Sequence, residues 1–429
     1  MRLWLIPMTY MGGAVVSGFL LPRIEQAYLA SYTFGLSVAS IQAFLSAVAS
    51  GMMALTAIVF AISIVMVQFS SSAYSPRLSI WFARDPTLFH SLGMFIATFI
   101  YSLATLAWVD RGGSGAVPLF SNILVLMLLV ISMVLFSLLV QRLTNLQVTN
   151  VLQKAGDRGR QVIRDMFIRL DSTPSQEPVA RIRPGPRTQT LKYVGVPRTI
   201  AEFDIGALTR HAQDASGTIV MACAVGDTVV ENTTLLSVIG GSKALSEKRL
   251  LQAIEFAPDR TFEQDPKFAI RLLADIAIKA LSSAINDPTT AVQAIDQIQD
   301  LLGRLGQRNL DAGRIRDANG VLRLVVPMPT WEDYLALAFD EIRQFGAGSV
   351  QVLRRLRSAL ADLADTLPHR DCAEAVQRYL DHLDLAIERS PFDAQDQAMA
   401  RQEDRQGLGL AGKRGKTIEE ATQIDGLAQ

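Results

Sequence analysis

Residues 41–69, IQAFLSAVASGMMALTAIVFAISIVMVQF, form an apolar stretch without a charged side chain. The charge-free region extends beyond it on both sides, from Gln26 to Pro76. A charged side chain at the centre of a bilayer costs at least about 2.5 kcal/mol. A helix needs about 20 apolar residues to cross the hydrocarbon layer. The stretch is therefore predicted to be a membrane-spanning helix.

Three further stretches have the same character, at residues 3–22, 87–109 and 118–141. Residues 1–141 hold only eight of the 82 charged side chains of the chain, and residues 142–429 hold the other 74. This partition predicts a multi-pass α-helical membrane domain at 1–141, with four transmembrane helices, followed by a polar region in water.

Basic side chains predict the orientation of these helices. Arg77 and Arg84 lie between the second and third stretch, and six more follow the fourth: Arg142, Lys154, Arg158, Arg160, Arg164 and Arg169. In residues 23–40 and 110–117 each arginine is balanced by an acidic residue. Since basic residues favour the cytoplasmic side, we expect both termini and the polar region to be cytoplasmic.

The polar region is predicted to be α+β, with four parts. Residues 142–187 form a basic juxtamembrane helix and a proline-rich linker. Residues 188–242 form a small β domain, whose strands around the turn Gly226-Asp227 suggest a biotinyl-like unit. No lysine occupies this turn, so no cofactor is expected. Residues 243–390 form a helical bundle, and the polar, aperiodic residues 391–429 form a disordered tail.

A stripe of small side chains follows one face of the second stretch. This small-residue stripe consists of Ala43, Ala47, Ser50, Ala54, Ala57 and Ala61. One interpretation is a tightly packed central helix whose hydroxyl groups bond to backbone carbonyls. The other is a helix that lines a polar path in a homo-oligomer. The candidate residues of that path are Thr56, Ser63, Gln68, Ser70, Ser71 and Ser72.

Arg77 follows Pro76, which is expected to end or bend the second helix near Ser75. At the membrane interface the guanidinium group can pair with lipid phosphate. Anchoring at the interface is the favoured interpretation, and a ligand contact is the alternative.

A second group of polar residues lies within 28 residues of the helical region: Arg260, Asp265, Arg271, Asp275, Asn286 and Asp287. The two pairs Asp265-Pro266 and Asp287-Pro288 have the form of a helix start, an N-cap followed by proline. Capping explains both aspartates. The group could also bind an anion through Arg260 or Arg271, bind a cation through Asp275 and Asp287, or form a structural ion-pair network, which is slightly favoured.

The chain resembles the DUF2254 family of predicted bacterial membrane proteins over almost its whole length. The resemblance rests on three segments: residues 68–77 (QFSSSAYSPR), Arg260-Thr261 with Gln264-Asp265, and residues 280–291 (ALSSAINDPTTA). Tyr74 and Ser283 depart from the usual Phe and Pro. The resemblance implies a protein of the bacterial cytoplasmic (inner) membrane with a large soluble region. It implies no activity, substrate or catalytic residue.

The sequence contains no catalytic motif, and its four histidines form no ligand pair, so we expect neither an enzyme nor a metal site. The leading hypothesis is an oligomeric channel or transport-related protein with a cytoplasmic assembly or gating domain. The alternative is a membrane-anchored sensor or scaffold whose cytoplasmic domain binds a ligand or a protein. Expected partners are the lipid bilayer, further copies of the chain, and a small ion or cytoplasmic ligand, but no nucleic acid.

Overall fold

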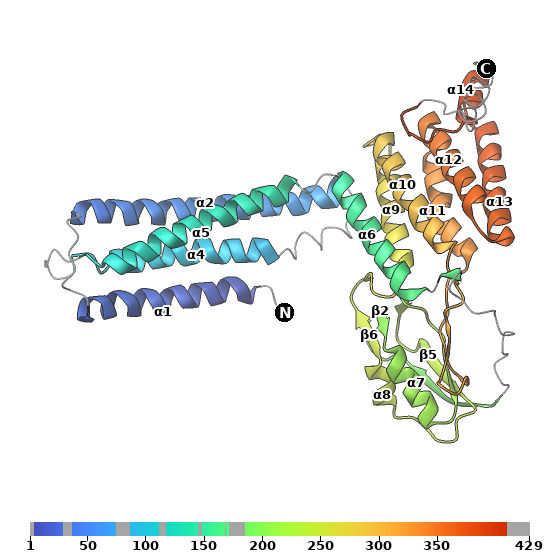
Figure 1. Cartoon of the computed structure of the whole chain (residues 1–429), viewed down its shortest axis with the longest axis horizontal. Coiled ribbons are helices and arrows are strands. Elements are labelled where there is room, and N and C mark those ends of the chain that lie inside the picture. The colour runs from blue at the N-terminus through green and yellow to red at the C-terminus, as the bar shows by residue number, and fades with distance from the viewer. Residues whose placement is uncertain are drawn as a thin grey trace, which may run out of the picture. The chain divides into compact units, whose positions relative to one another are not determined.

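The computed structural model describes residues 4–28, 37–73, 86–110, 117–144, 148–167, 169–170 and 185–409. The chain divides into two compact units, Met1–Gln147 and Val148–Gln429. The first consists of long helices, and the second combines helices with strands (Figure 1).

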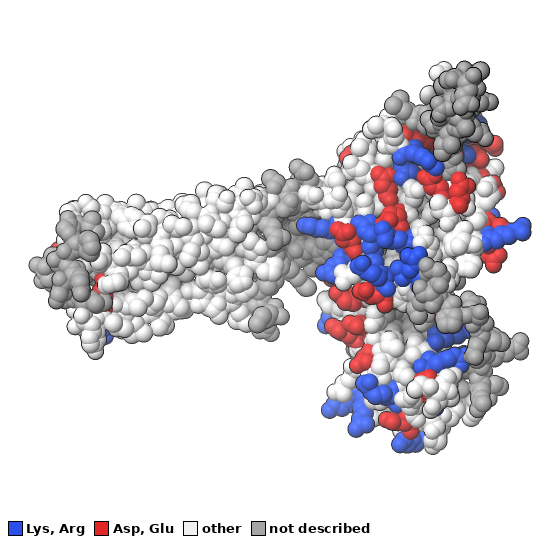
Figure 2. All heavy atoms as spheres, viewed as in Figure 1, with Lys and Arg blue, Asp and Glu red and all other residues white. Residues whose placement is uncertain are grey.

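Among its described residues, the first unit has four helices: α1 (Leu5–Tyr28), α2 (Val38–Ala73), α4 (Pro86–Leu106) and α5 (Leu119–Thr144). All four are long and apolar enough to cross a membrane. Charged side chains are almost absent from the visible surface of these helices, whereas they cover the second unit (Figure 2). The prediction of four apolar helices followed by an α+β region is confirmed.

Helix α4 is the central helix of the first unit, because it packs along α1, α2 and α5. Its contact with α1 depends on glycine. A Cβ atom at Gly18 would lie 2.6 Å from the Cβ of Ala104, and one at Gly93 would lie 2.9 Å from Cδ2 of Tyr10. Small residues of this kind let two helices approach closely in lipid.

The small-residue stripe of α2 does not take part in this packing. All six of its side chains are exposed, whereas Leu45, Met52 and Val59 on the opposite face of the helix are buried. The stripe is therefore not a packing face within the single chain, which corrects that part of the interpretation, whereas the hydroxyl groups of Thr56 and Ser63 do bond to backbone carbonyls as it predicts. The stripe is free to face lipid or another molecule.

Glu25 joins two helices of this unit, α1 and α5, that are far apart in the sequence. Its carboxylate accepts hydrogen bonds from the backbone N–H groups of Phe120 and Ser121, at 2.7 and 3.0 Å, and from the Ser121 hydroxyl at 2.9 Å. These N–H groups belong to the first turn of α5, where a carboxylate is favourable. Glu25 thus caps α5 from α1.

The second unit contains two small sheets. The first has the order β1 (Arg187–Lys192), β5 (Thr234–Ile239), β3 (Thr218–Met221), β8 (Leu322–Val325) and β7 (Arg314–Arg316). Neighbouring strands are antiparallel except β3 and β8, which are parallel. The second has the order β4 (Thr228–Val229), β2 (Arg198–Phe203) and β6 (Ile254–Ala257).

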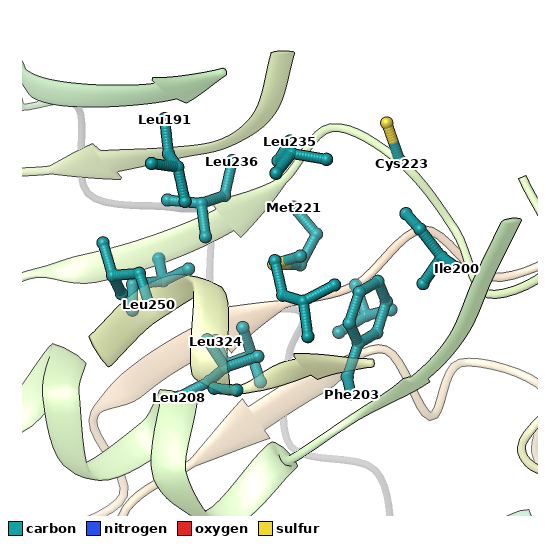
Figure 3. Packing of buried hydrophobic residues seen from close by; sticks show 14 of the residues in the cluster. Leu191, Ile200, Phe203, Leu208, Met221, Cys223, Leu235, Leu236, Leu250 and Leu324 are labelled. Atoms are coloured by element: carbon teal, nitrogen blue, oxygen red, sulfur yellow. The ribbon is translucent and has the colours of Figure 1, made fainter. Parts of the chain in front are cut away.

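The sheets share an apolar core with helices α7 (Ile205–Asp214) and α8 (Glu247–Gln252). Figure 3 shows Phe203, Met221, Leu236 and Leu324 converging there from four different strands. The β domain is therefore not the continuous segment 188–242 that the sequence suggested. It also takes β6 and β7 from the segment predicted to be helical, together with β8, which confirms a short strand that the sequence predicts at residues 322–326.

The remaining helices of the second unit are α6 (Val148–Met166), α9 (Pro266–Ala280), α10 (Pro288–Leu305), α11 (Trp331–Phe345), α12 (Val350–Thr366), α13 (Arg370–Glu388) and α14 (Ala394–Ala400). Helix α6 packs on α9 and α10. A Cβ atom at Gly159 would lie 2.8 Å from the Cβ of Ala269, so this contact is close. The predicted juxtamembrane helix is thus part of the bundle.

Residues 391–409 are ordered, which corrects the prediction of a disordered tail for this part of the segment. Helix α14 packs on α12. The fully buried Asp404 then accepts hydrogen bonds from the N–H groups of Gln406, Gly407 and Gly409. Backbone–carboxylate bonds order this segment without the apolar periodicity by which helices are recognised. Residues 410–429 lie outside the described part.

Candidate functional site

The described residues of the predicted polar path on α2 do not form a site within one chain. The Thr56 hydroxyl donates to the carbonyl of Met52 at 2.7 Å, and that of Ser63 donates to Val59 at 2.6 Å. Hydroxyl groups bonded in this way are satisfied by their own helix. Gln68 is exposed. The side chains of Ser70, Ser71 and Ser72, and all of Arg77, lie outside the described residues, so the path remains a prediction.

The predicted cytoplasmic cluster separates into three places. Arg271 donates to Asp275 of its own helix at 2.6 Å and to both carboxylate oxygens of Glu341 on α11 at 2.9 Å. The hydrogen bond with Arg271 lowers the pKa of Glu341, and in turn raises that of the guanidinium group. This part of the cluster is an ion-pair network that joins α9 to α11.

Asn286 and Asp287 lie in the connection between α9 and α10. Asn286 has a positive φ of 50° and an exposed side chain. The Asp287 carboxylate accepts from the N–H group of Thr290 at 3.1 Å and from its hydroxyl at 2.5 Å. Asp287 is thus an N-cap that uses its side chain in the expected way.

Arg260 and Asp265 form the third place, at the start of α9. Asp265 is the N-cap residue by position, but its side chain makes no capping hydrogen bond. It is 1% exposed, and neither carboxylate oxygen has a hydrogen-bond partner among the described residues. The nearest cationic atom is Nε of Arg260, 3.8 Å away. That Nε donates to the carbonyl of Gly226 at 2.8 Å instead.

The segment before α9 is held against strand β2. Gln264, in a left-handed conformation with φ 53°, donates its amide to Glu202 and to the carbonyl of Phe203, both at 3.0 Å, and accepts from the Phe203 N–H group at 3.2 Å. On the other side, a Cβ atom at Gly226 would lie 2.4 Å from Oδ2 of Asp265. Only glycine fits above this carboxylate, since φ is also +87° there.

Burial raises the pKa of Asp265, because the charged form loses hydration. Arg260 and then Lys267 oppose this shift, and the nearby N–H groups of Phe268 and Lys267 do so weakly without forming a well-directed hydrogen bond. The hydroxyl of Tyr334 on α11 is also buried and unpartnered among the described residues. Its pKa is raised by burial and by the charge of Asp265, which places the two groups in one neighbourhood.

A cavity of about 310 Å³ adjoins this carboxylate. It lies between the β strands, the start of α9 and the end of α6, and most of its walls are apolar. The lining residues are Asp165, Met166, Phe203, Ile205, Ala224, Val225, Gln264, Asp265, Pro266, Lys267, Ala312, Ile315, Val326, Pro327, Met328 and Pro329. An apolar pocket of this size with a few polar groups is typical of sites for small ligands.

Sequence reasoning found Arg260 and Asp265 but missed the cavity. Its walls come from six separate segments of the chain, between residues 165 and 329, and the long-range pairing of the strands helps to bring them together. No feature of the sequence distinguishes Tyr334, since a tyrosine on the apolar face of a helix is common in protein cores. Among the described residues, no group of three or more His, Cys, Asp or Glu side chains could hold a metal ion.

Comparison with known proteins identifies the family. The family described as "Predicted membrane protein (DUF2254)" matches residues 1–362. The chain belongs to the DUF2254 family. The residues around Asp265 and the whole cavity fall within the part that matches this family.

Two mycobacterial proteins are similar to this DUF2254 chain. "Uncharacterized protein MT1328" of Mycobacterium tuberculosis (strain CDC 1551 / Oshkosh) is 26% identical over 382 residues, which cover 87% of this chain and 71% of the relative. "Uncharacterized protein Rv1290c" of M. tuberculosis (strain ATCC 25618 / H37Rv) is 27% identical with the same coverage. No solved structure matches the chain significantly.

Proposed function

We propose that the protein is a membrane-anchored sensor whose polar unit binds a small ligand in the cavity beside Asp265. The observation that carries this proposal is the combination of a cavity of about 310 Å³ with a buried carboxylate that has no hydrogen-bond partner among the described residues. An unsatisfied buried polar group costs about 1–3 kcal/mol. A buried group left without a partner calls for an explanation, and a molecule that binds beside it supplies one.

Helix α6 supports a sensor rather than a simple carrier. Its last turn contributes Asp165 and Met166 to the cavity wall. Its first residue, Val148, follows the end of α5 at Thr144 after only three residues. A ligand that displaces the end of α6 would therefore act on a helix that is joined to a candidate membrane span by only three residues.

The proposal places the polar unit in the cytoplasm of a bacterial cell, with the four apolar helices in the inner membrane. The basic residues that follow α5 support this orientation. We assign no catalysis to the cavity: its walls contain no histidine, cysteine or serine. The expectation that the protein is not an enzyme remains a prediction.

The test is a ligand screen on the full-length protein in nanodiscs, with thermal unfolding as the readout. Compounds that bind the cavity should raise the unfolding midpoint. Ala224→Phe would fill the cavity, because Ala224 lines it, and should abolish the effect. Ala222→Phe is the matched control, since Ala222 is exposed and is not part of the wall. Equal responses of both variants would refute the proposal.

An oligomeric channel is the second candidate, and the exposed small-residue stripe of α2 favours it. In lipid, small side chains favour helix contacts, and no helix of the described chain covers this face. Ion flux through the protein in liposomes tests this function. Absence of flux under varied voltage, pH and ligand would exclude the channel, and the sensor would be the single remaining proposal.

A further inference from the structure

The cavity walls define what kind of ligand can enter. Met166, Phe203, Ile205, Val225, Val326 and Met328 provide apolar surface. A ligand that fills the cavity therefore needs an apolar body, because burial of a polar surface against these apolar side chains would be unfavourable.

Two carboxylates belong to the cavity wall. Asp265 is buried and lacks hydrogen-bond donors. Asp165, at the end of α6, is exposed, and makes no ion pair or hydrogen bond with the described residues. An ionised carboxylate only accepts hydrogen bonds, so a cationic donor would complete Asp265 and hold it in its charged form.

Positive groups also adjoin the cavity, and they must be weighed. Lys267 and Pro266 line it, and Pro266 is the first residue of α9, whose N-terminus carries a partial positive charge. Arg260 lies beside Asp265. An anionic ligand could meet Lys267 and the helix N-terminus. It would leave Asp265 unsatisfied, however, and would bring a third negative charge next to two carboxylates.

We propose that the cavity selects a small apolar ammonium compound, whose N–H groups donate to Asp265 while its apolar body lies against the walls. This inference rests on the sensor function proposed above. The carboxylate oxygens are closed to water in the unliganded chain, so binding includes a turn of the Asp265 side chain towards the cavity that it lines.

Three probes of similar shape test the selection: 2-phenylethylamine, 2-phenylethanol and 3-phenylpropionate. Titration calorimetry on the full-length protein in nanodiscs near neutral pH should show the amine binding about tenfold or more tightly than the alcohol, since hydrogen bonds between charged groups are the stronger ones. The carboxylate should bind most weakly. Tighter binding of the alcohol or the carboxylate, or no binding of any probe, would overturn the inference.

Two variants test whether Asp265 causes the preference for the amine over the alcohol. Asp265→Asn should remove the advantage of the amine over the alcohol, whereas Asp259→Asn, an exposed carboxylate outside the cavity, should keep it. An unchanged preference in Asp265→Asn would also overturn the inference. The comparison of probes on the unaltered chain needs no variant to fold. If the alcohol binds equally well and Ala224→Phe abolishes its binding, the cavity is a ligand site and only the ammonium selection fails.

Discussion

At the scale of single residues, the two Asp-Pro pairs show how one motif serves two purposes. Both aspartates precede a helix that begins with proline, at Pro266 and Pro288. The Asp287 carboxylate caps its helix, whereas that of Asp265 lies against Gly226 and Arg260. The sequence predicts where the helices start. It does not predict which carboxylate remains unpartnered, because that depends on a turn 39 residues earlier in the chain.

The buried carboxyl group of Asp265 should make stability depend on pH. Its pKa is raised in the folded protein, mainly by burial. Between the usual pKa and the raised pKa, the folded state therefore holds a proton that the unfolded state has lost. The free energy of unfolding falls as pH rises through this range. In Asp265→Asn this loss is absent. Without ligand, the unfolding midpoint of the variant relative to the unaltered chain should increase as pH rises above about 4; a constant difference would contradict this.

Asp287 should behave as an ordinary cap. Asp287→Ala removes the acceptor of the Thr290 N–H group, and is expected to cost about 1 kcal/mol of stability. Asp287→Asn keeps an acceptor oxygen and should cost much less. Hydrogen exchange at the first turn of α10 is the measurement. Equal protection in both variants would show that the cap contributes nothing.

At the scale of helices, the membrane unit shows what small residues can and cannot reveal. Glycine at positions 18 and 93 marks the contact between α1 and α4, whereas Gly12 and Gly13 touch no neighbour within 4 Å of an added Cβ atom. The alanine stripe of α2 is exposed. The spacing of small residues predicts a close contact, but it does not say which helix, or which molecule, provides the other side.

We expect the stripe to face another copy of the chain. Cysteine at Ala54 or Ala57 should then form disulfide-linked dimers in membranes treated with an oxidant, in a background without Cys223 and Cys372. Met53 is the control position, since it is exposed but lies to the side of the stripe on the helix. Cross-linking that is equal at all three positions, or absent from the stripe, would exclude this contact.

At the scale of the whole molecule, the partition of charge predicted the two units, but not the topology of the second. The apolar helices need only a local pattern to be recognised. The sheet requires β3 to pair with β8, about a hundred residues later, and no local periodicity records such a partner. The candidate site inherits this difficulty. Arg260 and Asp265 are visible in the sequence, while the cavity depends on the sheet.

The orientation of the whole chain follows from the same charge argument and can be tested directly. Six basic side chains lie within residues 142–169, in the last turn of α5 and after it, so the second unit should stay in the cytoplasm. In intact cells, a membrane-impermeant maleimide should not label cysteine at Ala244, an exposed position of the second unit. Cysteine at Ser114, between the third and fourth span, should be labelled. Inverted vesicles should reverse both results, because the face that the reagent meets is then the cytoplasmic one. Labelling of position 244 from outside would place the cavity outside the cell, and its ligand would then be an extracellular compound.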